Sequence, residues 1–428
     1  MGVLSRDWKS FARNVPRLGK GCGAFSKPWK LALVGLLFAL GCASERVRVD
    51  RGAFVTAGGK AFVPRGFNYI RLFPGRSHNT FDPEHYDAAA LERALQRWQD
   101  DGFNVVRVFI NTAVQVPGAI ARQETPGLDN GYVRALADFL TRARRHHIGV
   151  MLCMESYPHT APYSTGVKPV PPGMSPANAE YLEASRIAAK VRFLQDLTAA
   201  LEAAQPGCLD AVFAWDLQNE FSYQVGPPFT LDSGSITTAQ GGTYALPAQR
   251  QELADEGAIH FINQLADALH RARPGTLVGA SVFTYAAVGR SGPGDFRKLK
   301  AGWQNRVPFR QQALLQSRAD FLDVHFYSAD RKAFERDLAS VEFDEVRRRA
   351  RETGKPLFVG EFGAFKGAFP KVEPAADWLA ALTMEFGRRG FAGWLHWTYD
   401  THEQSAELWH ACDGESAIYR RLKDFQAR

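Results

Sequence analysis

AVFAWDLQNEF, residues 211–221, is the stretch of this chain that decides its fold. It begins with five apolar residues and turns polar at Asp216, Asn219 and Glu220. A short, continuous apolar run of this kind is typical of a buried strand. Strands that are apolar along their length and ionisable at the carboxyl end are typical of a (β/α)8 barrel, whose functional groups lie at the C-terminal mouth. The stretch therefore predicts a barrel strand that carries Glu220 to the mouth.

A second stretch, PLFVGE at residues 356–361, has the same pattern and ends at Glu361. Counted along the chain, the two stretches are the fourth and seventh expected strands. In a barrel these two strands face each other across the mouth. We therefore expect the carboxylates of Glu220 and Glu361 to lie close together.

Eight segments have the length and apolar character of buried strands, and helical patterns separate them. The expected strands are residues 64–69, 104–110, 148–154, the opening stretch, 277–283, 321–327, 357–361 and 392–397. Expected helices are residues 87–100, 131–145, 179–204, 248–272 and 416–425. Strands that alternate with helices predict parallel βα units, so the fold class is α/β and the architecture a (β/α)8 TIM barrel.

Segments outside the expected barrel strands add two features. Residues 47–63 alternate apolar and polar residues around Gly58-Gly59. A Gly-Gly pair is a hairpin signal, so we expect a short N-terminal β-ribbon at the barrel floor. Long loops at residues 222–247 and 284–308 follow strand ends, the side on which barrels build specificity.

Length and charge indicate one domain behind a leader. The chain has 428 residues, 45% of them hydrophobic, and a formal net charge of +7. Residues 1–41 contain seven Lys or Arg and one acidic residue, Asp7, so +6 of the charge lies there and +1 remains for the rest. A nearly neutral body gives no electrostatic basis for binding nucleic acid. We expect a leader at residues 1–41 and a single barrel domain at residues 42–428.

The leader has the organisation of an export signal. Basic Lys27 and Lys30 precede ten apolar residues, 31–40. Spanning a bilayer takes ~20 apolar residues, so this run fits a signal h-region. The ending ALGC resembles the lipobox of bacterial lipoproteins, which implies cleavage before Cys42 and a lipid on its thiol. We expect an exported lipoprotein, in the periplasm or at the outer membrane or cell surface; an ordinary secretory signal cut near Ala43 is the alternative.

Five scattered cysteines without a CxxC pair do not form a disulfide framework, although a bridge between Cys208 and Cys412 stays open. No His, Asp and Glu cluster has metal-ligand spacing, and there is no phosphate loop or GxSxG elbow. We therefore expect neither a metal nor a cofactor.

Two carboxylates at one mouth suit one reaction above others. Hydrolysis of a glycosidic bond needs a proton donor for the leaving oxygen and a second carboxylate that attacks the anomeric carbon or activates water. Burial and a negative neighbour are expected to raise the pKa of the donor, while the nucleophile stays ionised.

Motifs at five strand ends resemble glycoside hydrolase family five, a family of retaining (β/α)8 glycosidases. They are NE at 219–220, GEFG at 360–363, NVVRV at 104–108, DVHFY at 323–327 and WLHW at 394–397. The resemblance covers residues 61–397 and implies that Glu220 is the acid/base and Glu361 the nucleophile. The third strand ends in ESY, where many members have histidine, which leaves the subfamily and the sugar open.

The resemblance also implies substrate-binding roles for residues at the other strand ends. They are Arg107 under the nucleophile, Asn219 on the sugar 2-hydroxyl, the pair His325 and Tyr327, whose hydroxyl bonds the nucleophile, and Trp397 as an aromatic platform. Tyr69 and Trp303 are further candidates, because an aromatic face stacks on the C–H face of a pyranose.

The sequence thus predicts a retaining hydrolase of a β-linked oligo- or polysaccharide, of the β-mannan or β-glucan type. A transglycosylase on the same scaffold and a non-catalytic, glycan-binding surface lipoprotein are the alternatives, followed by a metal-dependent barrel hydrolase. The sequence leaves open whether attack is internal or from a chain end, and the oligomeric state.

Overall fold

The computed structural model describes residues 46–70, 79–300, 302–307, 309–327, 331–400, 406–411 and 417–424. The expected leader at residues 1–41 and the lipidation candidate Cys42 lie outside these residues. In the part of the chain that is described, no helix combines the length and the apolar character needed to cross a bilayer.

Within the described residues, eight parallel strands close into a barrel in the order β10-β12-β13-β14-β3-β4-β5-β6. Their bounds are β3 Arg65–Asn68, β4 Val105–Ile110, β5 Gly149–Met154, β6 Val212–Asp216, β10 Leu277–Phe283, β12 Phe321–Phe326, β13 Leu357–Phe362 and β14 Phe391–His396. Most of their residues are buried because one face packs inside the barrel and the other under helices. Each expected strand is present, so the predicted (β/α)8 barrel is confirmed.

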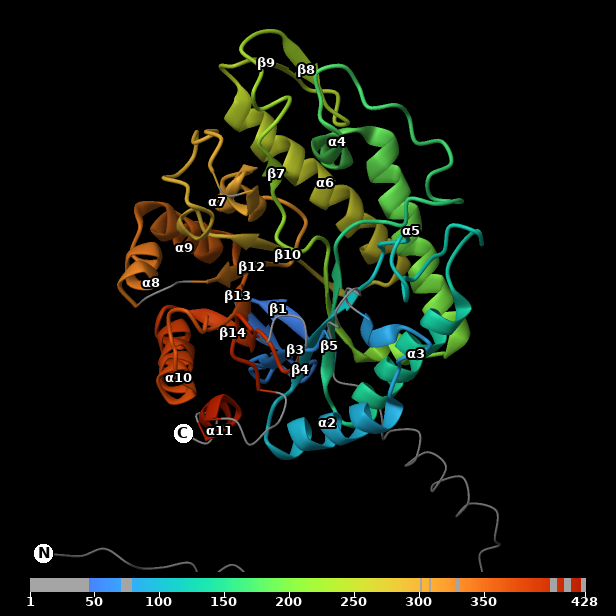
Figure 1. Cartoon of the computed structure of the whole chain (residues 1–428), viewed down its shortest axis with the longest axis vertical. Helices are drawn as coiled ribbons and strands as arrows, with labels where there is room; N and C mark the ends of the chain where they lie inside the picture. The colour runs from blue at the N-terminus through green and yellow to red at the C-terminus, as the bar shows by residue number, and fades with distance from the viewer. Residues whose placement is uncertain are drawn as a thin grey trace, which may run out of the picture. The chain divides into compact units, whose positions relative to one another are not determined.

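Helices surround the strands, as Figure 1 shows in the view onto the barrel. Their bounds are α2 Ala88–Asp100, α3 Asn130–Arg145, α4 Pro176–Leu182, α5 Ala184–Ala204, α6 Arg250–Ala272, α7 Gln311–Leu314, α8 Arg331–Leu338, α9 Val341–Thr353, α10 Val372–Arg388 and α11 Ala417–Asp424. Asp87 and Asp129 explain where α2 and α3 begin, because their side chains accept hydrogen bonds from Ala90 N and Tyr132 N.

The expected helix over residues 179–204 is wrong in one respect. The chain breaks at Glu183, which ends α4 and begins α5 with an extended backbone. Its carboxylate accepts from the amide of Arg186, as an N-cap side chain does. A glutamate in the middle of a helical pattern gives no sign of such a break, since it is a good helix former.

The N-terminal ribbon closes the floor, although its hairpin turn was predicted in the wrong place. β1 (Arg48–Asp50) and β2 (Ala53–Val55) pair around Arg51-Gly52, both with positive φ. Gly58-Gly59 instead forms a second turn that brings Ala61 back onto Val55. Between the two turns, Phe54 projects into the barrel and its ring contacts Phe213, Phe321 and Phe358.

The two long loops are joined beside the mouth. The first contains β7 (Tyr223–Gln224) and the hairpin of β8 (Ser235–Thr237) with β9 (Thr243–Ala245), and the second contains β11 (Arg306–Val307). β7 and β11 pair antiparallel, with Arg306 opposite Gln224. This pairing brings residues from after the fifth strand next to the segment that follows Glu220.

Candidate active site

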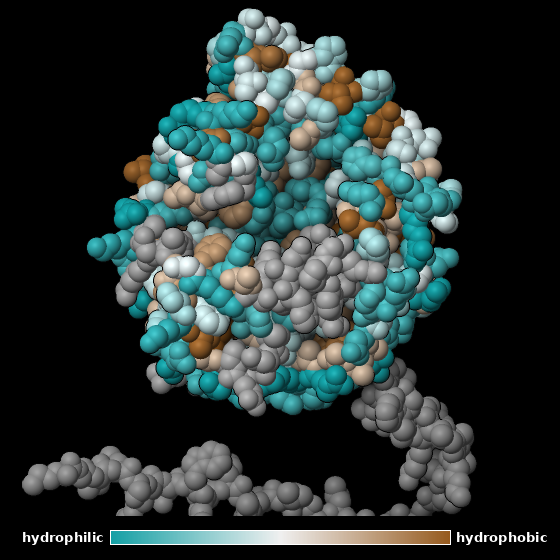
Figure 2. All heavy atoms as spheres, in the orientation of Figure 1, coloured by the Kyte–Doolittle hydropathy of each residue, from teal (hydrophilic) through white to brown (hydrophobic). Residues whose placement is uncertain are grey.

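The barrel brings the two predicted glutamates together. Glu361 lies on β13, directly opposite His325 of β12 in the parallel register. A carboxylate oxygen of Glu220, one of Glu361 and a ring nitrogen of His325 all lie within 4.8 Å of one another. The face of the barrel drawn in Figure 2 is hollowed near its centre, where hydrophilic residues line it.

Arg107, on β4, is the charged centre beneath this pair. It is fully buried, and its guanidinium donates to Glu361 Oε1 at 2.5 Å and to Asp216 Oδ2 at 2.7 Å. It also donates to the side-chain oxygens of Asn219 at 2.8 Å and Asn68 at 2.9 Å. Two carboxylates and two amide oxygens thus neutralise and hydrogen-bond a charge that is buried away from the surface.

Glu361 is held on its other oxygen by two groups from β12 and the residue after it. The hydroxyl of Tyr327 donates to Oε2 at 2.8 Å, and His325 Nδ1 lies 3.5 Å from the same oxygen. The side chain of Glu361 is 3% exposed, so its orientation is set by these donors and Arg107. Such a carboxylate is aimed and cannot rotate without losing hydrogen bonds.

Glu220 sits on a strained turn that is clamped from the neighbouring strand. Its φ of 47° is in the left-handed region, where a residue with a side chain is uncommon. Its amide donates to Ser281 Oγ at 2.8 Å, and the same hydroxyl donates to the carbonyl of Gln218 at 3.0 Å. The amide of Asn219 donates to Met154 O at 2.7 Å on the other side. These bonds hold the backbone conformation that turns Glu220 toward Glu361.

Both oxygens of the Glu220 carboxylate have cationic partners. Oε1 lies 3.2 Å from His325 Nδ1, and Oε2 accepts from Arg306 Nη1 at 2.9 Å. The guanidinium of Arg306 is also centred 4.7 Å above the ring of Phe283. Arg306 was missed by the sequence analysis, because it lies in a loop and only the β7–β11 pairing places it here.

These contacts set the direction of the pKa shifts. Burial alone would lower the pKa of His325, but Glu361 and Asp323 raise it to about 10, so the imidazole is a cation. Burial raises the pKa of Glu220, yet His325 and Arg306 together hold it below its ordinary value. Burial raises the pKa of Glu361 above its ordinary value, although His325 and Arg107 act against that rise, so the shift runs against the expectation that the nucleophile is readily ionised. The expected raised pKa of Glu220 is therefore wrong for this state, because His325 and, to a smaller extent, Arg306 are bound to it.

The three aromatic residues predicted to bind sugar lie in different places. Trp397 is 7% exposed and belongs to a cluster with Phe109 and Cys153 that Tyr327 packs against, so it lies next to the site. Tyr69 was predicted wrongly: its ring is buried between Trp98 and Phe139 of helices α2 and α3, where no sugar can stack on it. The backbone of Trp303 lies in a 3-10 turn, Gly302–Gln304, and its side chain lies outside what the structure describes.

Several buried polar residues support the site and were not predicted. Asn68 donates to the carbonyl of Gly360 at 2.8 Å, which ties β3 to the strand of Glu361. Cys153 is a buried free thiol that lies 3.1 Å from the Arg107 guanidinium. Lys190 of α5 is 3% exposed and donates to Gln218 Oε1 at 2.6 Å, and burial lowers its pKa to about 7. A polar residue within an apolar pattern is the sequence signal that could have found them. Cys208 is likewise a buried free thiol, and Cys412 lies outside the described residues.

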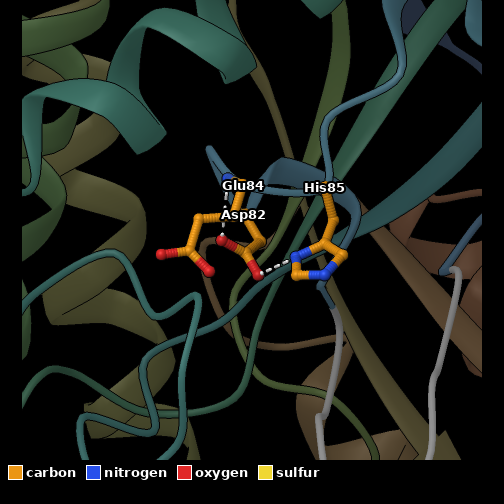
Figure 3. Close-up of side chains that lie close together, drawn as sticks. All are labelled: Asp82, Glu84 and His85. Carbon is orange, nitrogen blue, oxygen red and sulfur yellow. Dashed lines mark hydrogen bonds and ion pairs between the residues drawn. The ribbon is translucent and has the colours of Figure 1, made fainter.

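The sequence analysis found no His, Asp and Glu cluster with metal-ligand spacing, but the fold brings such residues together. Besides the site itself, Asp82, Glu84 and His85 bring ligand-type atoms within 4.8 Å of one another (Figure 3). Asp82 already accepts from His85 Nδ1 at 2.7 Å and from the amide of Glu84 at 3.1 Å. The group is thus explained as a hydrogen-bonded turn before α2.

Comparison with known proteins comes from structure alone, because no protein-family model and no curated protein matches the sequence. An endo-1,4-β-mannanase from Rhizomucor miehei matches with a TM-score of 0.58 and 13% identity, over 90% of this chain and 100% of that one. The chain has the fold of this mannanase. A glycoside hydrolase family 5 mannosidase from the same organism matches with a TM-score of 0.56 and 14% identity, over 90% of this chain and 98% of that one. An exo-β-1,4-mannosidase from Opitutaceae bacterium strain TAV5 matches with a TM-score of 0.56 and 17% identity, over 89% of this chain. This chain spans 62% of the length of that protein.

The expected likeness to the (β/α)8 fold of glycoside hydrolase family five is therefore confirmed. It is a likeness of fold, because every one of these identities is below one residue in five. What this chain does has to be argued from its own site.

Proposed function

We propose that the protein is a retaining glycoside hydrolase, with Glu361 as nucleophile and Glu220 as acid/base. One observation carries the proposal: two carboxylates, one on β13 and one on the turn after β6, have oxygens within 4.8 Å of each other at the barrel mouth. Retaining glycosidases hold their carboxyl groups about 5–5.5 Å apart, whereas inverting ones need about 6.5–9.5 Å to admit water.

The hydrogen bonds around each carboxylate support these roles. Arg107 and Tyr327 fix both oxygens of Glu361, which suits a group that must attack a carbon along one direction. Glu220 gives a proton to the leaving oxygen while Glu361 bonds to the anomeric carbon. Glu220 then takes a proton from water, and that water's oxygen displaces Glu361 from the sugar.

For the substrate we propose a β-linked mannan-type glycan, with β-glucan as the second class to test. The support is the fold shared with structures named mannanases and mannosidases. A screen of defined mannans, glucans and xylans with product sizing tests this proposal, and it also separates hydrolysis from transglycosylation and chain-end from internal attack.

The nucleophile has a direct chemical test. Glu361→Gln should lose at least about a thousandfold in kcat, because the covalent step has no alternative carboxylate. Glu361→Ala with added azide should regain turnover and release a glycosyl azide of inverted configuration, which mass and NMR analysis identify. Folded variants that stay active, or show no azide product, would remove Glu361 from this role.

Export and lipidation remain a proposal from the sequence, with Cys42 as the attachment site. Replacing Cys42 by Ser should move the protein from the membrane fraction to the soluble fraction and abolish its labelling by a palmitate analogue. An unchanged fractionation of the variant would favour the secretory signal cut near Ala43.

A further inference from the structure

Arg306 is the feature of the site that the proposed mechanism does not use. Its Nη1 donates to Glu220 Oε2 at 2.9 Å, on the oxygen that does not face His325. In the part of the chain that is described, Glu220 is the only side chain that Arg306 hydrogen-bonds. A general acid bound to a guanidinium is a poor acid, because the pair favours the ionised carboxylate. Some event in the reaction must therefore separate the two side chains.

The position of Arg306 shows which part of a substrate it would meet. Glu361 attacks the anomeric carbon from one side, and the departing unit leaves on the side of the acid. His325 lies between the two glutamates on the inner oxygen of Glu220, and Arg306 lies on the outer one. The guanidinium therefore borders the place of the departing sugar. Its side chain is 25% exposed, so a substrate can reach it.

The loop that carries Arg306 is built to hold it there. The backbone of Arg306 pairs with Gln224 across β7 and β11. Buried Arg290 donates to the carbonyls of Arg306 at 3.1 Å and Gln304 at 3.0 Å, which fixes the backbone at Arg306 and just before it. The ring of Phe283 supports the guanidinium from below. A planar cation on a rigid support, already bound to one carboxylate, is suited to bind another.

We infer that Arg306 recognises a carboxylate on the departing sugar, so that the preferred glycan has a uronic acid unit on the leaving-group side of the scissile bond. This inference rests on the proposed glycosidase function. When such a unit binds, Arg306 moves from Glu220 to the substrate carboxylate. Glu220 then takes up a proton from the buffered solvent (H3O+ becoming water) and donates it to the glycosidic oxygen. The substrate itself thereby removes one of the two cations that keep Glu220 ionised, so that the carboxyl takes up a proton more readily.

The test compares two disaccharides that share the glycone and differ only at C6 of the reducing unit, a hexose or the corresponding hexuronic acid. The native enzyme should show a kcat/KM at least about tenfold higher for the hexuronic acid, since a charged hydrogen bond is gained. Arg306→Gln should bring the ratio to about one. Lys300→Gln, which removes an exposed charge from the same loop, should leave the ratio unchanged.

A pH profile on the neutral disaccharide gives a readout that a merely structural role would not move. Glu220 faces His325, Arg306, Glu361 and Tyr327, and Arg306→Gln removes one of its two cations. The alkaline limb of kcat/KM should move upward by about half a pH unit or more, because the carboxyl keeps its proton longer. Equal rates on both disaccharides, or a preference that survives in Arg306→Gln, would overturn the inference.

Binding separates this inference from the proposed function. Calorimetry with the Glu361→Gln variant needs no turnover, and it should show tighter binding of the hexuronic disaccharide that Arg306→Gln abolishes. Tighter binding without any hydrolysis by the native enzyme would keep the recognition of a carboxylate by Arg306 and reject the glycosidase, together with the activation of Glu220. Hydrolysis without the binding preference would do the reverse.

Discussion

His325 is the residue in which the electrostatics of the site converge. Its Nδ1 lies 3.2 Å from Glu220 and 3.5 Å from Glu361, and its Nε2 lies 3.7 Å from Asp323. All these groups except Glu220 are almost completely buried. A neutral imidazole would leave the carboxylates of Glu220, Glu361 and Asp323 close together without the positive charge that offsets their repulsion. The proton on His325 therefore stabilises all three.

This proton makes stability depend on pH in a defined direction. The pKa of His325 is raised to about 10 in the folded protein and is about 6.5 in an unfolded chain. Its contribution is therefore fully present below about pH 6.5 and is lost as pH rises through about 10. His325→Asn should lower the free energy of unfolding by roughly 3–5 kcal/mol at pH 6 and by much less at pH 10.

Urea unfolding of both proteins at pH 6, 8 and 10 measures this difference. His159→Asn is the control, because His159 is exposed and outside the network, and its effect should be small at each pH. A deficit for His325→Asn that stays constant from pH 6 to pH 10 would show that the imidazole is neutral.

The sequence predicted the residues that end barrel strands and missed those that come from elsewhere. Glu220 and Glu361 follow apolar runs, so a barrel had to bring them to one mouth, and the structure does. Ser281 lies inside an apolar strand, and periodicity does not show that its hydroxyl bonds the turn after the neighbouring strand. The position of Arg306 depends on a two-residue pairing between loops. The prediction for Tyr69 failed because an aromatic side chain at a strand end can turn outward under the helices as easily as inward.

At the scale of elements, strands β12 and β13 are packed closely at Gly360, where the absence of a side chain leaves room for the carboxylate of Asp323. The amide of Gly360 donates to Asp323 Oδ1 at 2.5 Å. A Cβ at Gly360 would lie 2.0 Å from Asp323 Oδ2 and 2.5 Å from its Cγ, so the buried carboxylate would have to move. Glycine here permits the acid of one strand to bind the backbone next to Glu361 on the other.

Gly360→Ala should therefore disturb both stability and the site. We expect a loss of about 1–3 kcal/mol in the free energy of unfolding from overpacking. We also expect a fall of at least about tenfold in kcat per folded molecule, because Glu361 is the next residue. Gly387→Ala is the matched control: it lies exposed in α10 with no atom near its Cβ position, and it should be neutral or stabilising by up to about 1 kcal/mol. Equal effects of the two changes would contradict the argument.

The barrel elements were predictable because buried parallel strands and amphipathic helices each leave a period in the sequence. The break at Glu183 was not, since its cap is made by a residue that also favours helix. The ribbon was placed correctly at the floor, but residues 47–63 contain two glycine-containing turns, and both form. The sequence does not show that the first of them, Arg51-Gly52, is the one that joins β1 to β2.

For the whole molecule, the barrel separates folding at one end from chemistry at the other. The floor is a layer of aromatic rings. Phe54 of the ribbon is 1% exposed, and its ring centre lies 5.2 Å from that of Phe213 and 5.4 Å from that of Phe321. The mouth contains the charged network around Arg107. In (β/α)8 barrels generally, residues at the floor serve stability and those at the mouth serve function.

Phe54→Ala tests that separation. The change removes the ring that closes the floor, and Phe→Ala in a core destabilises by about 3–5 kcal/mol. The thermal midpoint should fall by several degrees, yet kcat and KM measured well below that midpoint should stay within about twofold of the native values, because the mouth keeps its contacts. Val341→Ala, at a side chain that is 80% exposed, should change neither property. A floor variant that folds but loses kcat in proportion to its stability would mean that the ribbon sets the geometry of the mouth, and that the two ends of this barrel are coupled through its strands.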